Sequence, residues 1–433
     1  MNFSAGFKKY FFNTSWLMAE RVFRMIVALF VGVYVARYLG PEQFGLLSYA
    51  ISFVGLFLAF STLGLDGIVI RELVKNPEKR NEFLGTAFGL KIFGALLMWL
   101  SIALALSFTD SDRQTIQLIS IIAFSAIFQA LNVIDFNYQA EVKAKLVVHA
   151  QFIQMILSSV FKLSLISTDA SLIWFAWAYL FDVFILSLGL SVVYMKKTGK
   201  IKKWNWNGRA AKSLLRDSWP LIISGMVISV YMRIDQVMIK EMLGAVDVGH
   251  YAAAVKISEA WYFVPITIAA SLFPAIINAK KEGAIVYSSR LKSLYRIMFL
   301  LAISIALPIS FISPVLIELL FGKEYQPAAF VLSIHIWAGI FVFLGVANAK
   351  RLLIENLQKI TMINTSIGAV INVILNIILI KKYGINGAAV STIISQCYAS
   401  YFGLLLFNNS RKSFKDISTI FVSDSLIKSY KNL

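Results

Sequence analysis

The sequence is dominated by apolar runs that are long enough to cross a lipid bilayer. Twelve such runs follow one another along the chain, at roughly 15–37, 45–64, 84–108, 115–134, 145–166, 171–195, 218–242, 249–278, 293–313, 326–347, 359–380 and 386–407. A helix needs about 20 apolar residues to span the hydrocarbon core, whereas a membrane-barrel strand needs only about 10 of alternating polarity. Because backbone groups in lipid must find hydrogen-bond partners within the protein, we expect an all-α polytopic membrane protein with twelve transmembrane helices.

The composition agrees with a membrane location. The chain is 58% hydrophobic and only 15% charged, and its mean hydropathy is +0.73. A soluble domain could not cover so much apolar side chain, since its surface needs polar groups. The net charge of +18 would suggest nucleic acid in a soluble protein, but here the cations mostly lie between apolar runs, so no nucleic-acid partner is expected. The single cysteine, Cys397, excludes a disulfide framework within the chain.

The distribution of lysine and arginine predicts the orientation in the membrane. If the N-terminus is cytoplasmic, about 29 of the 41 lysines and arginines fall in cytoplasmic segments and their flanks, and about 6 fall in outer segments. Cytoplasmic loops of membrane proteins carry such an excess of positive charge. The pattern therefore predicts a multi-pass protein with both termini in the cytoplasm.

The two halves of the chain resemble each other. Two segments that begin with Ser-Trp, one in each half, run for about one span and then reach Leu-Gly, with a second glycine five residues later. These glycines are Gly40 and Gly45 in the first half, and Gly244 and Gly249 in the second. Repeats of six spans each are related by an axis along the membrane normal. We therefore expect two six-helix bundles around a central cavity.

The repeat also suggests the domain limits. We expect an N-terminal bundle at 1–195, a basic cytoplasmic linker at 196–217, and a C-terminal bundle with a cytoplasmic tail at 218–433. The linker reads KKTGKIKKWNWNGRAAKSLLRD. It either binds the anionic headgroups of membrane lipids or is an ordinary cytoplasmic connector.

Ionisable side chains inside the predicted spans are the candidates for function, because such groups are costly in lipid and usually face protein or water. They are Glu20, Arg21, Arg24, Lys91, Lys162, Asp182, Arg233, Asp235, Lys256, Glu259 and His335. Cations slightly outnumber anions among them. One interpretation is a cation-lined aqueous cavity for an anionic substrate, and the other is a set of internal salt bridges that fix helix packing.

Helical spacing sorts some of these candidates. Arg233 and Asp235 are two residues apart, about 200° around a helix, so they cannot point into the same space. Lys256 and Glu259 lie at a similar predicted depth on the next span, which permits cross-helix pairing as well as a pair within that helix. A polar stripe on the fifth span comprises Gln151, Gln154, Ser158 and Lys162. Lys162, at its end, could instead extend to the membrane interface. His335 alone is more typical of a packed histidine than of a proton relay.

Six stretches in a fixed order carry a further signal: VARYLGPEQFGLLSYAISF, SWPLIISGMVISVYMRIDQVMIKEMLG, GHYAAAVKISEAWYFVP, SLFPAI, FGKEYQPAA and NVILNIILIKKYGINGAAVST. Together they resemble the O-antigen-type oligosaccharide flippases, the Wzx-type polysaccharide transporters of the multidrug/oligosaccharidyl-lipid/polysaccharide exporter superfamily. The resemblance covers about 16–406, which is nearly the whole chain.

This resemblance implies a transporter of the bacterial inner membrane that carries a polyprenyl-pyrophosphate-linked oligosaccharide to the outer leaflet by alternating access. By position, the substrate-binding cations would be Arg21, Arg24, Arg233, Lys256 and, less directly, Lys162. Asp235 and Glu259 would be the candidate ion-coupling residues. The partners would be the lipid-linked oligosaccharide and membrane lipids, and beyond these a polysaccharide polymerase and a chain-length regulator.

Three other functions stay open at this stage. A cation-coupled drug or metabolite exporter of the same superfamily would favour an acidic cavity, which the cationic excess opposes. A membrane polysaccharide polymerase or ligase would need a catalytic outer loop, and the outer loops are short. We see no nucleotide-binding glycine loop, metal cluster or nucleophile–base pair, so neither enzymatic chemistry nor a cofactor is expected. The third alternative is an assembly scaffold for a glycan export complex.

Overall fold

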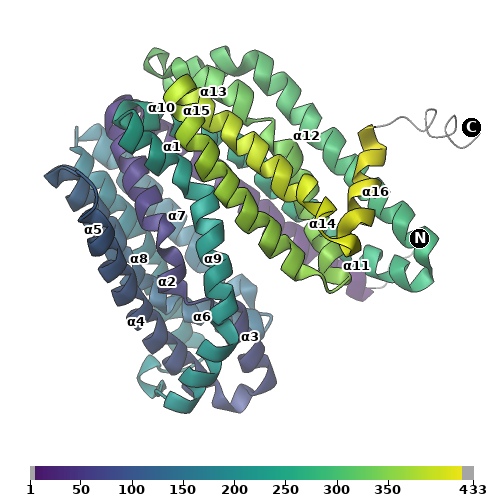
Figure 1. The fold of residues 1–433 in the computed structure, drawn as a ribbon. Helices are drawn as coiled ribbons and strands as arrows, with labels where there is room; N and C mark the ends of the chain where they lie inside the picture. Colours follow the sequence, from purple (N-terminus) through teal and green to yellow (C-terminus); the bar gives the residue numbers. More distant parts are fainter. Residues whose placement is uncertain (1–4, 422–433) are drawn as a thin grey trace, which may run out of the picture. The chain divides into compact units, whose positions relative to one another are not determined.

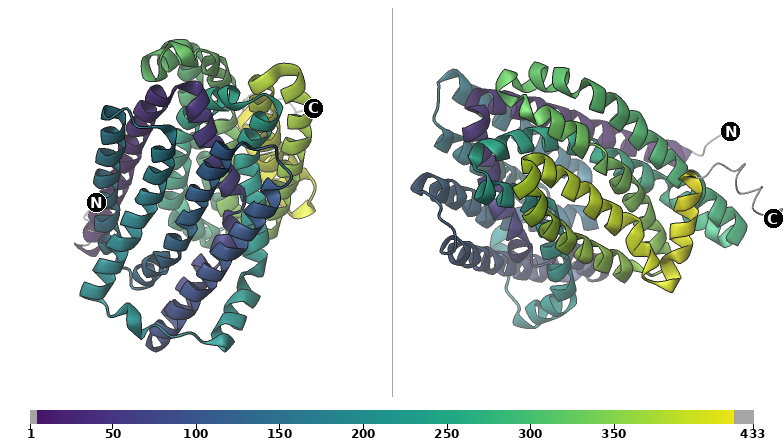
Figure 2. Two further views of the ribbon diagram at one scale, coloured as in Figure 1. Left: turned by 90° about the vertical axis from the view of Figure 1, so that its left-hand side faces the viewer. Right: turned by 45° about the horizontal axis from the view of Figure 1, so that its top comes forward.

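The computed structural model describes the backbone of residues 5–421 and the side chains of residues 22–143 and 145–419. All regular secondary structure in this range is helical, and no strand occurs in it. Figures 1 and 2 show helices joined by short connections. Ten helical segments within the described range are long and apolar enough to cross a membrane. The prediction of an all-α polytopic membrane protein is therefore confirmed.

The described chain divides into two compact units. The first comprises the residues up to Leu39 together with Leu46–Ser229, and the second comprises Gly40–Gly45 together with the residues from Val230 onward. The first unit holds most of α1 (Ala5–Leu56), α2 (Leu58–Thr62), α3 (Asp66–Lys75), α4 (Arg80–Leu106), α5 (Arg113–Gln129), α6 (Val133–Ala140), α7 (Ala144–Ser167), α8 (Leu172–Lys197) and the first part of α9 (Gly208–Met242). The second unit holds the rest of α9, and α10 (Ala245–Glu259), α11 (Phe263–Glu282), α12 (Ala284–Phe321), α13 (Pro327–His335), α14 (Ala338–Ile354), α15 (Gln358–Ser400) and α16 (Arg411–Phe421). The predicted domain limits of 1–195, 196–217 and 218–433 stay a prediction.

Two helices each cover a pair of predicted spans. α1 extends over the predicted spans at 15–37 and 45–64 as far as Leu56, and α15 together with the 3-10 turn that follows it covers those at 359–380 and 386–407. Each is interrupted by one glycine with a positive φ, Gly40 at 68° and Gly384 at 60°. Only glycine adopts this conformation without a steric cost, so these residues place the kinks. The apolar helical segments of the described residues accordingly number ten, and the count of twelve transmembrane helices stays a prediction.

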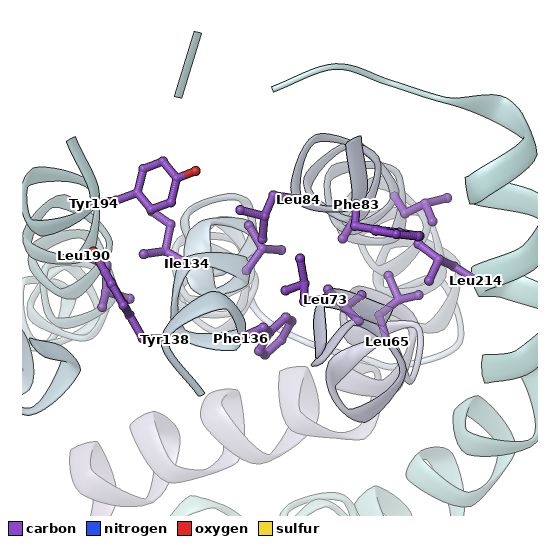
Figure 3. Packing of buried hydrophobic residues seen from close by; sticks show 14 of the residues in the cluster. Leu65, Leu73, Phe83, Leu84, Ile134, Phe136, Tyr138, Leu190, Tyr194 and Leu214 are labelled. Atoms are coloured by element: carbon purple, nitrogen blue, oxygen red, sulfur yellow. The ribbon is translucent and has the colours of Figure 1, made fainter. Parts of the chain in front are cut away.

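The core of the first unit lies where α3, α4, α6, α8 and α9 meet. Figure 3 shows its buried side chains, with Leu73, Leu84, Ile134 and Leu190 pointing into the space between these helices. All four are at most 5% exposed. Because lipid tails are as apolar as leucine, such side chains hold the helices of a membrane protein together mainly through van der Waals packing.

The basic segment between α8 and α9 packs onto the first unit. The Trp204 indole N–H donates to the Tyr194 hydroxyl at 3.1 Å. The Asn207 backbone N–H donates to Thr86 Oγ1 at 3.1 Å, and the Asn207 side-chain amide donates to Glu82 at 2.9 Å. These three hydrogen bonds attach residues 204–207, at the α9 end of the segment, to α4 and α8 of the first unit.

The second unit carries a docked C-terminal helix, α16, which packs against α12 (Figure 1). The Arg351 guanidinium, only 2% exposed, reaches Asp416 of α16 at 2.8 Å and Glu355 at 3.0 Å. The Phe414 ring stacks on Tyr401 with 4.5 Å between the ring centroids. A buried cation that loses one of its carboxylates is strongly destabilising, so this pairing fastens α16 to the helices that precede it.

The glycine repeat seen in the sequence forms a reciprocal contact within the second unit. A Cβ built on Gly45 would overlap the carbonyl oxygen of Ala245, and one built on Gly249 would overlap the carbonyl oxygen of Pro41. Pro41 and Ala245 hold the same place in the two repeats, directly after Gly40 and Gly244. The backbones of α1 and α10 therefore touch at matched positions, which requires glycine at both crossing points.

Candidate functional site

Asp235, on the part of α9 that belongs to the second unit, is a buried carboxylate held by three neutral donors. The Tyr251 hydroxyl of α10 donates to Oδ2 at 2.8 Å, and the Thr392 hydroxyl of α15 donates to the same oxygen at 2.7 Å. The Asn376 amide of α15 donates to Oδ1 at 2.6 Å. The Asp235 side chain is 8% exposed, and no ion pair among the described residues includes it. Hydrogen bonds alone offset the cost of burying this charge.

The same site offers further oxygen atoms. The Asn372 Oδ1 lies 3.2 Å from the Asn376 amide nitrogen, and the Asn376 Oδ1 is buried with no hydrogen-bond partner in the described part of the chain. The Thr392 hydroxyl also lies 3.0 Å from the backbone carbonyl of Ala388. Carboxylate, amide, hydroxyl and carbonyl oxygens are the ligands that hard cations take. One carboxylate among neutral oxygens suits a proton or a small monovalent cation.

A small cavity adjoins this carboxylate and brings a second one close to it. It has a volume of about 20 Å³, and its walls include Asp235, Tyr251, Glu259, His335 and Thr392. That space is enough for about one water molecule or small ion. The His335 Nδ1 lies 2.8 Å from the Ser258 hydroxyl, so this histidine is packed by a specific partner. We call this space the carboxylate cavity.

Among the predicted cations of the second unit, Arg233 lies near the carboxylate cavity. Its side chain is half-buried, its positive charge acts on Glu259, and no ion pair within 4 Å involves it in the described part of the chain. The Lys256 ammonium lies 5.7 Å from the centroid of the Phe44 ring, at the distance of a cation–π contact. The structure thus brings Asp235 and Glu259 into the wall of one cavity, while Arg233 lies outside that wall.

The predicted cations of the first unit have different surroundings. Lys162 of α7 forms an ion pair with Asp182 of α8, and the Gln154 amide donates to the same carboxylate. Two members of the predicted polar stripe therefore converge on one anion, so the charge of Lys162 is largely compensated within its own unit. Arg24 is half-buried on α1. The side chain of Arg21 lies outside the described residues. Substrate binding by these three residues stays a prediction.

Sequence reasoning missed three partners of Asp235. Tyr251, Asn376 and Thr392 lie 16, 141 and 157 residues further along the chain. One signal was visible, because Asn372 and Asn376 are four residues apart and share a face of a span. No group of three or more His, Cys, Asp or Glu side chains that could hold a metal ion occurs among the described residues.

Comparison with known proteins places these features in context. The model of a family described as "Polysaccharide biosynthesis protein" matches residues 11–280. A Shigella flexneri protein that is provisionally described as an O-antigen transporter is 24% identical over 401 residues, which cover 88% of this chain and 93% of the relative.

Two solved structures share the fold. The lipid II flippase MurJ in an inward closed conformation has a TM-score of 0.73 at 18% identity, covering 93% of this chain and 89% of the other. An inward-facing multidrug resistance MATE transporter of the MOP superfamily has a TM-score of 0.70 at 16% identity, covering 93% and 96%. At these identities the likeness concerns the fold alone.

Proposed function

Because the chain belongs to the polysaccharide biosynthesis protein family, we propose that it is a flippase for a lipid-linked oligosaccharide. The cargo is an O-antigen or capsule repeat unit on a polyprenyl pyrophosphate, carried from the cytoplasmic to the outer leaflet of the bacterial inner membrane. The family match carries this proposal. The Shigella flexneri relative, which aligns over most of both chains, supports it.

The intramembrane cations provide a physical reason for such a cargo. A pyrophosphate carries about two negative charges, and moving charges of this kind through hydrocarbon without compensation is prohibitive. A guanidinium binds phosphate oxygens bidentately, so Arg24 and Arg233 are proposed as the main phosphate ligands, with Arg21 and Lys256 assisting. Lys162 ranks below them, because Asp182 already neutralises it.

The substrate is proposed to move by alternating access, with both chain termini in the cytoplasm. In this scheme the pyrophosphate and sugars enter a cationic lumen from the cytoplasmic side and leave on the outer side. The polyprenyl tail stays in the lipid throughout, since burying its apolar surface in the bilayer is favourable.

Asp235 is proposed to couple transport to a proton or sodium gradient, with Glu259 as its neighbour in the carboxylate cavity. A proton or cation that reaches Asp235 changes the charge of a site whose donors come from α9, α10 and α15. Binding then alters how these three helices are held together. This supports a link between ion occupancy and helix arrangement.

Surface glycan tests the cationic lumen. We expect Arg24→Ala and Arg233→Ala to abolish surface polysaccharide while the amount of protein in the membrane stays normal, and the corresponding Lys variants to keep partial activity. Arg290→Ala, at an exposed position on α12, is the matched control and should export normally. Normal surface glycan in both Ala variants would remove these residues from the lumen.

Ion dependence tests the coupling proposal. In vesicles that contain purified protein and lipid-linked oligosaccharide, Asp235→Asn should change the dependence of flipping on sodium or on pH. Asp110→Asn, at an exposed position, should leave that dependence as in the unchanged protein. If Asp235→Asn also leaves it unchanged, Asp235 has no part in coupling.

A further inference from the structure

A second, larger cavity, partly open at the surface of the second unit, lies between α9, α14 and α15. Its volume is about 240 Å³, which is room for several water molecules. Polar side chains in its wall include Tyr231, Asn348, Thr361, Asn364 and Gln396, and no charged side chain lines it. A pyrophosphate would find no cation there, so this cavity differs in kind from the proposed phosphate-binding lumen.

The larger cavity adjoins the carboxylate cavity. The two share four wall residues, Tyr231, Met232, Tyr262 and Gln396. These side chains therefore border both the 240 Å³ space and the space beside Asp235. Three of the four carry a polar group, so the boundary between the cavities can support hydrogen bonds.

The polar wall indicates that the larger cavity contains water. Tyr231, Asn348, Thr361 and Gln396 line it, and each carries a group that can hydrogen-bond to water. A cavity of this size with several polar side chains in its wall is expected to hold water rather than to be empty.

The cavity extends toward one face of the membrane. Leu352, in its wall, lies two residues before α14 ends at Ile354, and Thr361 lies three residues after α15 begins at Gln358. It thus reaches to within about one helical turn of the α14–α15 connection. The excess of positive charge predicts that this connection is cytoplasmic.

We propose that this cavity is an aqueous access chamber through which a proton or a small monovalent cation reaches Asp235 and Glu259 from the cytoplasmic side. The residues that line this route all belong to the second unit. The function that we assign to the chamber, delivery of an ion, rests on the proposed coupling role of Asp235. The chamber itself rests on the two adjoining cavities and on the wall of the larger one, which is polar and carries no charged residue.

Thiol labelling tests the chamber without any transport assay. In a Cys397→Ser background, Thr365→Cys and Thr361→Cys place small thiols in the wall, and Val370→Cys places one at a 58% exposed position on the same helix. A membrane-impermeant, positively charged methanethiosulfonate is applied to one side of the vesicles or to the other. Val370 lies in an apolar run and is expected to face lipid, where a thiol is poorly ionised, so the chamber thiols should react at least about tenfold faster than Val370→Cys from the cytoplasmic side.

The outcomes separate the chamber from the coupling proposal. The chamber is overturned if both chamber thiols react as slowly as Val370→Cys, or if they react only from the outer side. This holds whatever effect Asp235→Asn has on transport. Fast labelling that slows in sodium relative to choline, and no longer does so with Asp235→Asn, supports the chamber with sodium as its ligand. Fast labelling that sodium does not alter supports it as a path for protons. Having two chamber positions guards against one variant failing to fold.

Discussion

Replacing Gly249 with alanine adds a methyl group at the point where α10 meets the backbone of α1. The new Cβ would stand 2.7 Å from the carbonyl carbon of Pro41 and 3.0 Å from its Cα, and closer still to its carbonyl oxygen. Ordinary Cβ contacts begin at 3.4 Å, so the carbonyl carbon alone requires a separation of about 0.7 Å. Backbone atoms cannot turn aside as a side chain can, so the two helices must move apart.

The expected cost follows from this geometry. Overpacking that forces backbone shifts costs about 1–3 kcal/mol, and alanine returns up to about 1 kcal/mol through its higher helix propensity. The net loss therefore lies between about 0 and 3 kcal/mol, and a loss near the middle of this range lowers the equilibrium constant for folding by roughly tenfold. The reciprocal variant Gly45→Ala should cost a similar amount, because its Cβ meets the backbone of Ala245 in the same way.

Thermal unfolding of the purified protein, followed by tryptophan fluorescence, measures the effect. Gly249→Ala should lower the melting temperature by a few degrees, while Gly339→Ala should not, since a Cβ at Gly339 meets no atom within 4 Å. The double variant with both crossing glycines replaced should cost less than the two single changes together, because one separation relieves both overlaps. A melting temperature for Gly249→Ala equal to that of Gly339→Ala, or strict additivity in the double variant, would refute the reasoning.

Three further predictions concern ion pairs and a helix cap. Asp416→Asn removes one of the two carboxylates that Arg351 contacts, so α16 should become sensitive to limited proteolysis, at a cost near the lower end of 3–5 kcal/mol. Asp182→Asn leaves Lys162 without its ion-pair partner and should lower the melting temperature, whereas Asp182→Leu combined with Lys162→Met should restore it. Asp112 caps the N-terminus of α5, and hydrogen bonding lowers the pKa of its carboxyl, so its stabilisation is present above the unfolded pKa and is lost as the pH falls through the folded one. Asp112→Ala should cost about 1 kcal/mol at neutral pH and flatten this acid dependence in unfolding experiments.

Matched controls make these results decisive. Lys415→Ala changes an exposed charge on α16 and should leave proteolysis unaltered. Proteolysis of α16 in Asp416→Asn at the rate seen for Lys415→Ala would contradict the docking role of Arg351. If Asp182→Leu combined with Lys162→Met melts at as low a temperature as Asp182→Asn, loss of charge compensation does not explain the lower melting temperature. Asp110→Asn should leave the acid dependence of unfolding unchanged. If Asp112→Ala also leaves it unchanged, Asp112 does not stabilise α5 as a helix cap.

The helices could largely be predicted from the sequence. The predicted span at 145–166 corresponds to α7 (Ala144–Ser167), and that at 171–195 corresponds to α8 (Leu172–Lys197). These agreements reflect a local cause, since the length of an apolar run decides whether a helix can cross the hydrocarbon. The matched spacing of the glycines was also visible in the sequence, because it is a local pattern. The contact that they allow between α1 and α10 was not visible, because it depends on how two distant segments pack.

The candidate site divides in the same way. Asp235 and Lys162 stood out in the sequence, because a charge inside an apolar run is conspicuous whatever surrounds it. Sequence alone does not say that Asp235 is held by Tyr251, Asn376 and Thr392, or that Lys162 is paired with Asp182. Those partners follow from the rotation and depth at which each helix packs against its neighbours.

The sequence by itself determined that this chain crosses a membrane many times as helices, and which charged residues stand inside those helices. Hydrophobic length and helical period are properties of short stretches of chain, so they can be read without a fold. Only the tertiary structure decided which of these charges are compensated and which adjoin a cavity, because ion pairs and cavities form between residues that lie far apart along the chain.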